Sequence, residues 1–363
     1  MNKQLYFVLP AFLISIALII FLLAPAPSSS PKSTNLETCQ TLSYSSPEAA
    51  NLVFFSEKSE AEKYSNYLFK EITPFKENKD SFNIYYITNY LPECELYQGI
   101  ATLCYSKELT QKAASCPNDY IVVLDEQPSS IRSSSYMNVL SINKAHQLSV
   151  FPHEIGHAFA NLAEEYVPAK LPRSQQNCVE NCEEFNGINQ DCEQGCSESN
   201  YYRSINSGIM RTLSSNTYGA FNENLIQKII NTQTNTITGQ AVSTPENCEE
   251  QYYYLIEALN ENEKLKILSK SLQQGCIGKN GYGPDKAEIL DGQNQILTSS
   301  SFNSELIFTD APGEEEINGE TFVSEKPFFI KAPIIKDSNK LKITTQTQDE
   351  IQLINEGNTP CKV

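Results

Sequence analysis

Residues 148–166 read LSVFPHEIGHAFANLAEEY and contain the pattern H-E-x-x-H at 153–157. A helix rotates by about 100° per residue, so His153 and His157 lie about 40° apart on one face and one turn apart along the axis. Both imidazoles can therefore reach one metal ion. Glu154 lies about 100° round the helix from His153, beside the metal, where a general base for an activated water molecule is needed. The pattern predicts a hydrolytic metal centre with His153 and His157 as ligands and Glu154 as catalytic base.

The opposite face of this helix is apolar. Its large apolar residues fall roughly 160° to 240° from His153 on the helical wheel; they are Leu148, Phe151, Ile155, Phe159 and Leu162. We therefore expect a helix over residues 143–161 that buries one face and offers the other to the metal. Pro152 conflicts with a continuous helix, because an interior proline removes a hydrogen bond and kinks the axis. It either kinks the helix or marks the start of a second one.

A third ligand is needed, because a catalytic zinc ion usually has three protein ligands and one open position. The chain has 3 histidines, and His146 lies roughly 10 Å from His153 along a continuous helix, too far to share the ion. A carboxylate is therefore expected, from Glu164 or Glu165, with Glu164 preferred. Either one reaches the metal only if the helix ends first, and Asn161 suits a left-handed helix end.

Composition sets broad limits on the protein. The 363 residues include 27 Lys and Arg against 44 Asp and Glu, a formal net charge of −17. This acidity excludes a large nucleic-acid interface, which needs a basic face. The hydrophobic fraction of 40%, with 17 Phe and 19 Tyr, supports packed cores and excludes wholesale disorder. The length predicts two domains with additional segments.

The N-terminal segment indicates export. Residues 5–23 are almost all apolar, which is long enough for a membrane-spanning helix. Residues 1–26 are therefore a cleaved signal peptide or a retained membrane anchor, and the length of the run favours the anchor. In both cases the remainder is expected outside the cytoplasm, secreted or at the cell surface, and it contacts the membrane through this segment if the segment is uncleaved.

The cysteines agree with export. The chain has 11, too many for a typical reduced cytosolic protein, and they predict a disulfide framework whose pairing the sequence does not fix. The odd number leaves at least one cysteine free or paired with another molecule. Four of them, Cys178, Cys182, Cys192 and Cys196, could instead form a zinc site, but disulfides are the favoured interpretation in this compartment.

Composition and patterning divide the rest of the chain into four regions. Residues 27–42 are expected to form a flexible stalk. Residues 43–230 alternate strands and helices, which predicts an α/β domain. Residues 231–262 are expected to be a linker with a short helix at 248–259, and residues 263–363 a small antiparallel β-sandwich. Within the α/β region we expect strands at 51–55, 82–87, 120–124 and 137–142, and a helix at 59–72.

The stretch 153–166 resembles the signature of the IgA-peptidase family of zinc metallopeptidases, typically H-E-x-G-H-x-F, then a Gly, then L-A-D-E-Y. It departs at Asn161, where the family usually has Gly, and at Glu164, where it usually has Asp. Residues 75–83, the spacing of Cys94 and Cys104, and the block YR at 202–203 with NSGIMR at 206–211 also resemble family segments. The last block has one extra Gly. The resemblance covers roughly residues 50–230.

This resemblance implies a metzincin-like catalytic domain, with a mixed sheet and an active-site helix, that holds Zn²⁺ as its cofactor. It implies that Met210 forms the Met turn, a hydrophobic floor under the metal, and that Tyr166, Tyr202 and Arg211 are candidates for contacting the substrate or the oxyanion. The expected activity is that of an extracytoplasmic zinc endopeptidase acting on a protein or peptide.

Two alternatives stay open at this point. One is a catalytically inactive surface protein for binding or adhesion that retains the metal site. The other is a metal-dependent hydrolase of a non-peptide amide. The sequence carries no prediction of oligomeric state.

Overall fold

The computed structural model describes residues 36–185, 191–235, 245–261, 264–278, 281–313 and 316–353. The predicted signal peptide or anchor at 1–26 lies outside these ranges, and so do residues 27–35 of the predicted stalk. Among the described residues, the helices are all too short or too polar to span a bilayer. The end of the predicted stalk is not flexible chain, because Gln40–Ser43 form a strand paired with the main sheet.

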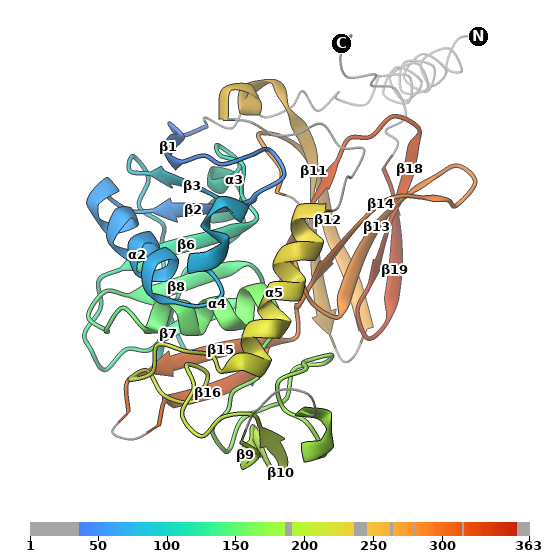
Figure 1. Cartoon of the computed structure of the whole chain (residues 1–363). Coiled ribbons are helices and arrows are strands. Elements are labelled where there is room, and N and C mark those ends of the chain that lie inside the picture. The colour runs from blue at the N-terminus through green and yellow to red at the C-terminus, as the bar shows by residue number, and fades with distance from the viewer. Residues whose placement is uncertain are drawn as a thin grey trace, which may run out of the picture. The chain divides into compact units, whose positions relative to one another are not determined.

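The main feature is a mixed sheet of 8 strands within the described residues (Figure 1). Across the sheet the strands are β1 (Gln40–Ser43), β3 (Phe82–Ile87), β2 (Ala50–Phe55), β6 (Tyr120–Asp125), β8 (Val139–Asn143), β7 (Ser133–Tyr136), β15 (Leu306–Ala311) and β16 (Asn318–Val323). β3, β2, β6 and β8 are parallel. The other four are antiparallel to their neighbours. The predicted mixed α/β fold is confirmed at this level.

Helices cover both faces of the sheet. α2 (Lys58–Glu71), α4 (Val150–Ala160) and α5 (Ala220–Asn235) pack on one face with Leu52 and Phe54 of β2 (Figure 1). α3 (Lys107–Ala113) packs on the other face with Val53 and Phe55 of the same strand. Alternate side chains point to opposite faces, so a strand covered on both sides is apolar throughout. This explains why the predicted strands 51–55, 82–87 and 120–124 are mostly apolar.

Two smaller antiparallel sheets share one hydrophobic core, which includes Ile256 and Phe328 from one sheet and Ile289 and Leu341 from the other. In order across each sheet, the first contains β12 (Lys264–Gln274), β11 (Tyr252–Glu261) and β17 (Phe328–Pro333), and the second contains β14 (Ile296–Phe302), β13 (Asp285–Asp291), β18 (Ser338–Thr344) and β19 (Gln348–Gln352). The remaining short elements are η1 (Lys76–Ser81), η2 (Cys182–Phe185), η3 (Pro245–Glu250) and the paired strands β4 (Glu95–Tyr97) with β5 (Ala101–Leu103) and β9 (Glu193–Cys196) with β10 (Glu198–Arg203).

The predicted linker is largely wrong. α5 continues to Asn235, and the predicted helix at 248–259 is instead mostly β11, the central strand of its sheet. The run of tyrosines at 252–254, followed by Leu255 and Ile256, favours a strand because aromatic and β-branched side chains fit a half-buried pleated surface. Residues 236–244 lie outside the described residues.

The sequence predicts a separate sandwich over 263–363, but two strands of this range lie in the large sheet. β15 pairs with β7, and β16 pairs with β15. Without them β7 would be an edge strand with unpaired backbone groups. The C-terminal region therefore contributes directly to the sheet that supports α4.

Ten of the cysteines form disulfides, which confirms the predicted framework. The pairs are Cys39–Cys116, Cys94–Cys104, Cys178–Cys196, Cys182–Cys192 and Cys248–Cys276. The four cysteines considered for a zinc site are thus two nested bridges. Five disulfides are consistent with an extracellular location.

Candidate metal centre

Helix α4 carries the histidines, and its two ends explain its length. It begins at Val150 and not at residue 143. Pro152 therefore lies in the first turn, where backbone N–H groups have no partner within the helix and a proline removes nothing. It ends at Asn161, which adopts the predicted left-handed conformation with φ 51° and ψ 35°. The N–H of Leu162 then returns to the carbonyl of Gly156 at 3.1 Å and closes the helix end.

The histidine side chains converge, as the H-E-x-x-H pattern predicts. The Nε2 atoms of His153 and His157 are 3.1 Å apart. Nδ1 of His153 lies 3.0 Å from the carbonyl oxygen of Ile209, and Nδ1 of His157 lies 2.7 Å from that of Leu162. A carbonyl only accepts, so each Nδ1 carries a proton and leaves Nε2 as the nitrogen that can bind a metal ion. The two Nε2 atoms therefore face the same point, and metal-binding histidines are usually oriented in this way by a carbonyl bonded to their other nitrogen.

Glu164 joins the two histidines because the chain turns back after Asn161. Its carboxylate oxygens lie 3.0 Å from Nε2 of His157 and 3.6 Å from Nε2 of His153. Glu165 points elsewhere, since its carboxylate accepts hydrogen bonds from the Asn222 amide at 2.8 Å and the Asn177 amide at 3.4 Å. Of the two alternatives, Glu164 is the one that the structure brings to the histidines.

A fourth member of the group is Asp310, which the sequence analysis missed. Its Oδ2 lies 3.4 Å from Nε2 of His153. Ligand atoms of His153, His157, Glu164 and Asp310 all lie within 4.8 Å of one another, and we call these four residues the metal group. The available signal was an acidic residue inside the apolar strand Leu306–Ala311, all of whose side chains are buried. Buried acids are rare unless they are paired or bind a metal.

The donor set fits a divalent cation. A tetrahedral ion with ligands at about 2.0–2.1 Å holds its donor atoms about 3.3 Å apart, and the distances found here, 3.0, 3.1, 3.4 and 3.6 Å, scatter around this value. Both oxygens of Glu164 and Oδ2 of Asp310 are buried without a hydrogen bond from the described residues. Two facing lone pairs and two buried carboxylates repel one another unless a cation lies between them. Nitrogen and oxygen donors in this number suit Zn²⁺.

Glu154 lies beside this group and is also buried, at 0% exposure. Neither of its oxygens accepts a hydrogen bond of ordinary geometry from the described residues. Burial, and then the charges of Asp310 and Glu164, raise the pKa of the Glu154 carboxyl well above its usual value, and the nearby Ser135 hydroxyl opposes this only in part. A carboxyl that is costly to ionise is suited to take up and return a proton.

The pKa values of the two histidines diverge because the carboxylates mainly stabilise the protonated form of His153. Burial alone would lower the pKa of His153, but Asp310 and Glu164 raise it to about 9. Burial and the neighbouring His153 lower the pKa of His157 to about 3. A divalent cation would replace the proton that His153 attracts.

Met210 lies under the helix. It is fully buried, and a Cβ added to Gly156 would lie 2.5 Å from its Sδ. The glycine of H-E-x-G-H thus leaves room for the Met210 thioether between the two histidine positions. The structure places Met210 where a hydrophobic floor is predicted, while its description as a Met turn stays a prediction.

The three residues predicted to contact the substrate or the oxyanion, Tyr166, Tyr202 and Arg211, make contacts in different parts of the structure. Tyr166 is buried and its hydroxyl donates to Oδ1 of Asp310 at 3.1 Å. Tyr202 pairs through its backbone with Val179. The Arg211 guanidinium donates to the carbonyl of Asn206 at 2.6 Å and pairs with Glu316. Only Tyr166 contacts a member of the metal group through these bonds.

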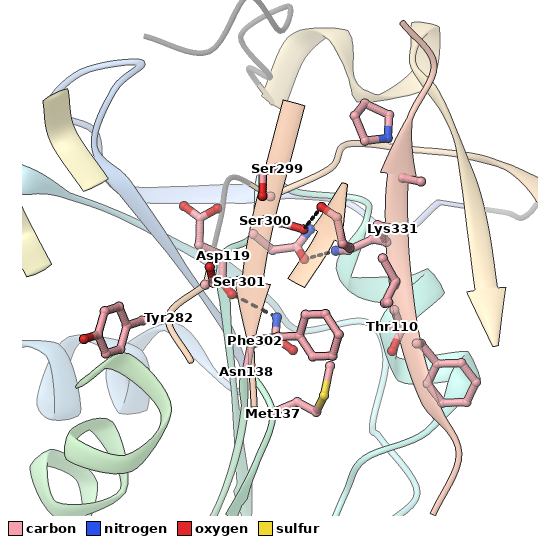
Figure 2. Close-up of a pocket in the computed structure, with 18 of the residues that line it drawn as sticks. Thr110, Asp119, Met137, Asn138, Tyr282, Ser299, Ser300, Ser301, Phe302 and Lys331 are labelled. Atoms are coloured by element: carbon pink, nitrogen blue, oxygen red, sulfur yellow. Dashed lines mark hydrogen bonds between the residues drawn. The ribbon is translucent and has the colours of Figure 1, made fainter. Parts of the chain in front are cut away.

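A cavity of about 100 Å³ lies elsewhere, and none of the four metal-group residues lines it. Figure 2 shows the serine run Ser299–Ser301 with Lys331 on one side and Tyr282 on the other. The Lys331 ammonium donates to Oδ1 of Asn118. Burial lowers the pKa of Lys331 to about 8, against the opposing charge of Asp119.

Comparisons of the sequence with protein-family models and with curated proteins found no match.

Proposed function

We propose that this protein is a zinc-dependent endopeptidase that works outside the cytoplasm. The observation that carries the proposal is the convergence of His153, His157 and Glu164 on one point, with Glu154 buried beside them. The H-E-x-x-H pattern alone does not require a downstream carboxylate beside both imidazoles, so the position of Glu164 is additional support. The resemblance to the IgA-peptidase family rests on the quoted residues, and it supports a peptide as the substrate class.

In this proposal the side chains have distinct tasks. His153, His157 and Glu164 would hold Zn²⁺, and the bound ion would polarise the scissile carbonyl and lower the pKa of a water molecule. Glu154 accepts a proton from the attacking water while the water oxygen bonds to the carbonyl carbon. It then gives this proton to the amide nitrogen as the C–N bond breaks, so that an amine and a carboxylic acid leave. The carbonyls of Ile209 and Leu162 keep the two imidazoles oriented through their Nδ1–H groups.

The location has separate support. Five disulfides favour an oxidising compartment. Attachment to the membrane through residues 1–26, as opposed to secretion after cleavage, stays a prediction.

A binding protein with a structural metal is the second candidate, and one observation favours it. Asp310 brings the number of protein donors to four, and four protein ligands without an open position are typical of structural zinc. Hydrolysis of a peptide would decide for the peptidase, because a structural site binds zinc without hydrolysing peptides.

The matched pair Glu164→Gln and Glu165→Gln tests the metal ligands in the full chain. Glu164→Gln is expected to lose bound zinc, measured by elemental analysis after dialysis, whereas Glu165→Gln retains about one equivalent because its carboxylate bonds to Asn222 and Asn177. Glu154→Gln is expected to keep the zinc and to lose hydrolysis of denatured protein substrates. Wild-type hydrolysis by Glu154→Gln would reject the mechanism.

A further inference from the structure

The hairpin β15–β16 covers the metal group. Two side chains of β15 that point to the same face of the strand do this. The Phe308 ring stacks on the His157 imidazole with centroids 3.8 Å apart and an interplanar angle of 9°. Two residues on, Asp310 Oδ2 lies 3.4 Å from Nε2 of His153. The metal group is consequently buried, with His153, Glu164 and Asp310 at 0% exposure.

Asp310 occupies the position that hydrolysis requires to be open. Catalytic zinc uses three protein ligands and leaves one position for water or substrate. His153, His157 and Glu164 already supply three donors, and Asp310 supplies the fourth within the same 4.8 Å group. With this carboxylate as a fourth ligand, no position would be left for an attacking water molecule, and Glu154 is itself inaccessible.

β15 also takes the place of an extended peptide. It pairs antiparallel with β7 in the register Ile307↔Tyr136 to Asp310↔Ser133. Extended peptides commonly bind proteins by adding a strand to a free sheet edge. The edge of β7 is the one from which a bound strand reaches His153 and His157, as β15 itself demonstrates. The hairpin and a substrate strand would therefore compete for one ladder of hydrogen bonds.

The ion pairs that hold the hairpin at the surface contribute less to its closure than its buried contacts do. Arg132 pairs with Glu320 at 3.2 Å, and Arg211 pairs with Glu316, both at partly exposed positions where ion pairs contribute little. Among the described strands, β16 has a neighbour on one side only and forms the end of the sheet. Closure thus depends mainly on the buried contacts of Ile307 in the core, on Phe308 and Asp310, and on the ladder to β7.

We propose that the β15–β16 hairpin is an intramolecular inhibitor, and that the closed chain is the latent form of the peptidase. This inference rests on the proposed function. Asp310 holds the fourth metal position in the closed form, and displacement of the hairpin from β7 opens both this position and the strand edge to a peptide.

The test uses the full chain loaded with Co²⁺, whose visible absorption reports ligand changes, and azide as a small probe of an open position. Asp310→Ala removes the fourth donor. If the loss of side-chain volume in this variant impairs folding, Asp310→Asn is used instead, because asparagine has the shape of aspartate without its charge. Glu320→Gln is the control, because it removes an acid from the same hairpin away from the metal group. Hydrolysis of a denatured protein is measured in parallel with Zn²⁺.

We expect azide to leave the wild-type and Glu320→Gln spectra unchanged and to shift that of Asp310→Ala. Hydrolysis by Asp310→Ala should rise by about tenfold or more over wild type, since loss of one charged buried contact changes a closed–open equilibrium by at least this factor.

Three results would overturn the inference, and they are distinguishable. An azide response already present in wild type shows that Asp310 is not a ligand, and wild-type hydrolysis would then leave the proposed function intact. Complete loss of Co²⁺ from Asp310→Ala and Asp310→Asn shows an obligatory structural ligand. If azide shifts the spectrum of Asp310→Ala but neither wild type nor this variant hydrolyses the protein substrate, both the latent form and the proposed peptidase activity are rejected.

Discussion

The Tyr166 hydroxyl donates a 3.1 Å hydrogen bond to Oδ1 of Asp310, and both side chains are buried. The bond joins the segment that follows α4 to the hairpin β15–β16. Gly319, opposite Asp310 on β16, makes this approach possible, because a Cβ at residue 319 would collide with the Tyr166 hydroxyl and the Asp310 carboxylate. The aspartate is thus held in place from two sides.

Tyr166→Phe should therefore destabilise the protein. The change removes one donor and leaves a buried carboxylate oxygen unpaired, which costs about 1–3 kcal/mol. Urea unfolding of the full chain measures the loss as a lower midpoint with an unchanged slope. Tyr202→Phe is the control, expected within about 0.5 kcal/mol of wild type because this ring is half-buried at the surface. Equal effects of the two changes would contradict the role assigned to the Tyr166 hydroxyl.

Chelation of the metal should lower stability. A ligand that binds only the folded chain stabilises it by about 4 kcal/mol when its free concentration is about a thousandfold above Kd. Its removal also leaves Glu154, Glu164 and Asp310 buried close together, as their mutual effects on pKa indicate. Thermal unfolding with and without a chelator measures the change, and readdition of Zn²⁺ should reverse it.

The Glu164→Gln variant is the control for this experiment, since its unfolding temperature should not respond to the chelator. An unfolding temperature of the wild type that is equally insensitive to chelation would show that no stabilising ion binds.

Gly156→Ala should be destabilising despite its higher helix propensity. Alanine in place of glycine gains about 1 kcal/mol in a helix interior, but here the new methyl group would lie 2.5 Å from the Met210 Sδ. Overpacking of a core usually costs about 1–3 kcal/mol, so the clash should outweigh the gain. The double variant with Met210→Ala removes the clashing atom, and a double-mutant cycle should give a favourable coupling free energy. Simple additivity of the two changes would contradict this packing.

Stability should depend on pH through Lys331. Burial lowers its pKa to about 8 in the folded chain, against about 10.4 for an unfolded lysine. Between these values the unfolded chain binds more protons than the folded chain, so the free energy of unfolding rises with pH, by at most about 1.4 kcal/mol per pH unit for one proton. Below pH 8 both states are protonated and this contribution is constant.

The variant Lys331→Gln isolates this effect. The difference in unfolding free energy between wild type and variant should grow in favour of wild type from about pH 8 to about pH 10.4. A difference that is constant over this range would show that Lys331 titrates normally.

The predictable part of the site is the part encoded locally. His153 and His157 share a helix face by spacing, and Asn161 fixes the direction in which the chain returns to bring Glu164 back. The choice of Glu164 over Glu165 followed from the same geometry. The parallel strands are also recognisable from the sequence, because burial on both faces makes them mostly apolar.

The missed parts depend on distant contacts. Asp310 belongs to a strand whose partner, β7, lies far away in the chain, and no periodicity within 306–311 identifies this neighbour. The predicted helix at 248–259 is wrong because a short apolar run is compatible with a helix or a strand, and the pairing of β11 with β12 and β17 decides for the strand. The helix at Val150 follows Ser149, whose hydroxyl donates to the distant carbonyl of Leu213 at 2.5 Å, a contact that the local pattern does not reveal.

The return of β15 to the large sheet also sets the order in which this protein can be made. Tyr166 and Asp310 are 144 residues apart in sequence, so during synthesis the histidines, Glu164 and the β7 edge all emerge well before the strand that covers them. The nascent chain passes through a stage in which an unpaired sheet edge and the group around His153 and His157 are exposed together. Contacts with such a large separation form slowly, because the loop must first be closed. The β7 edge and the residues around His153 therefore stay exposed until residue 311 has been added and docked.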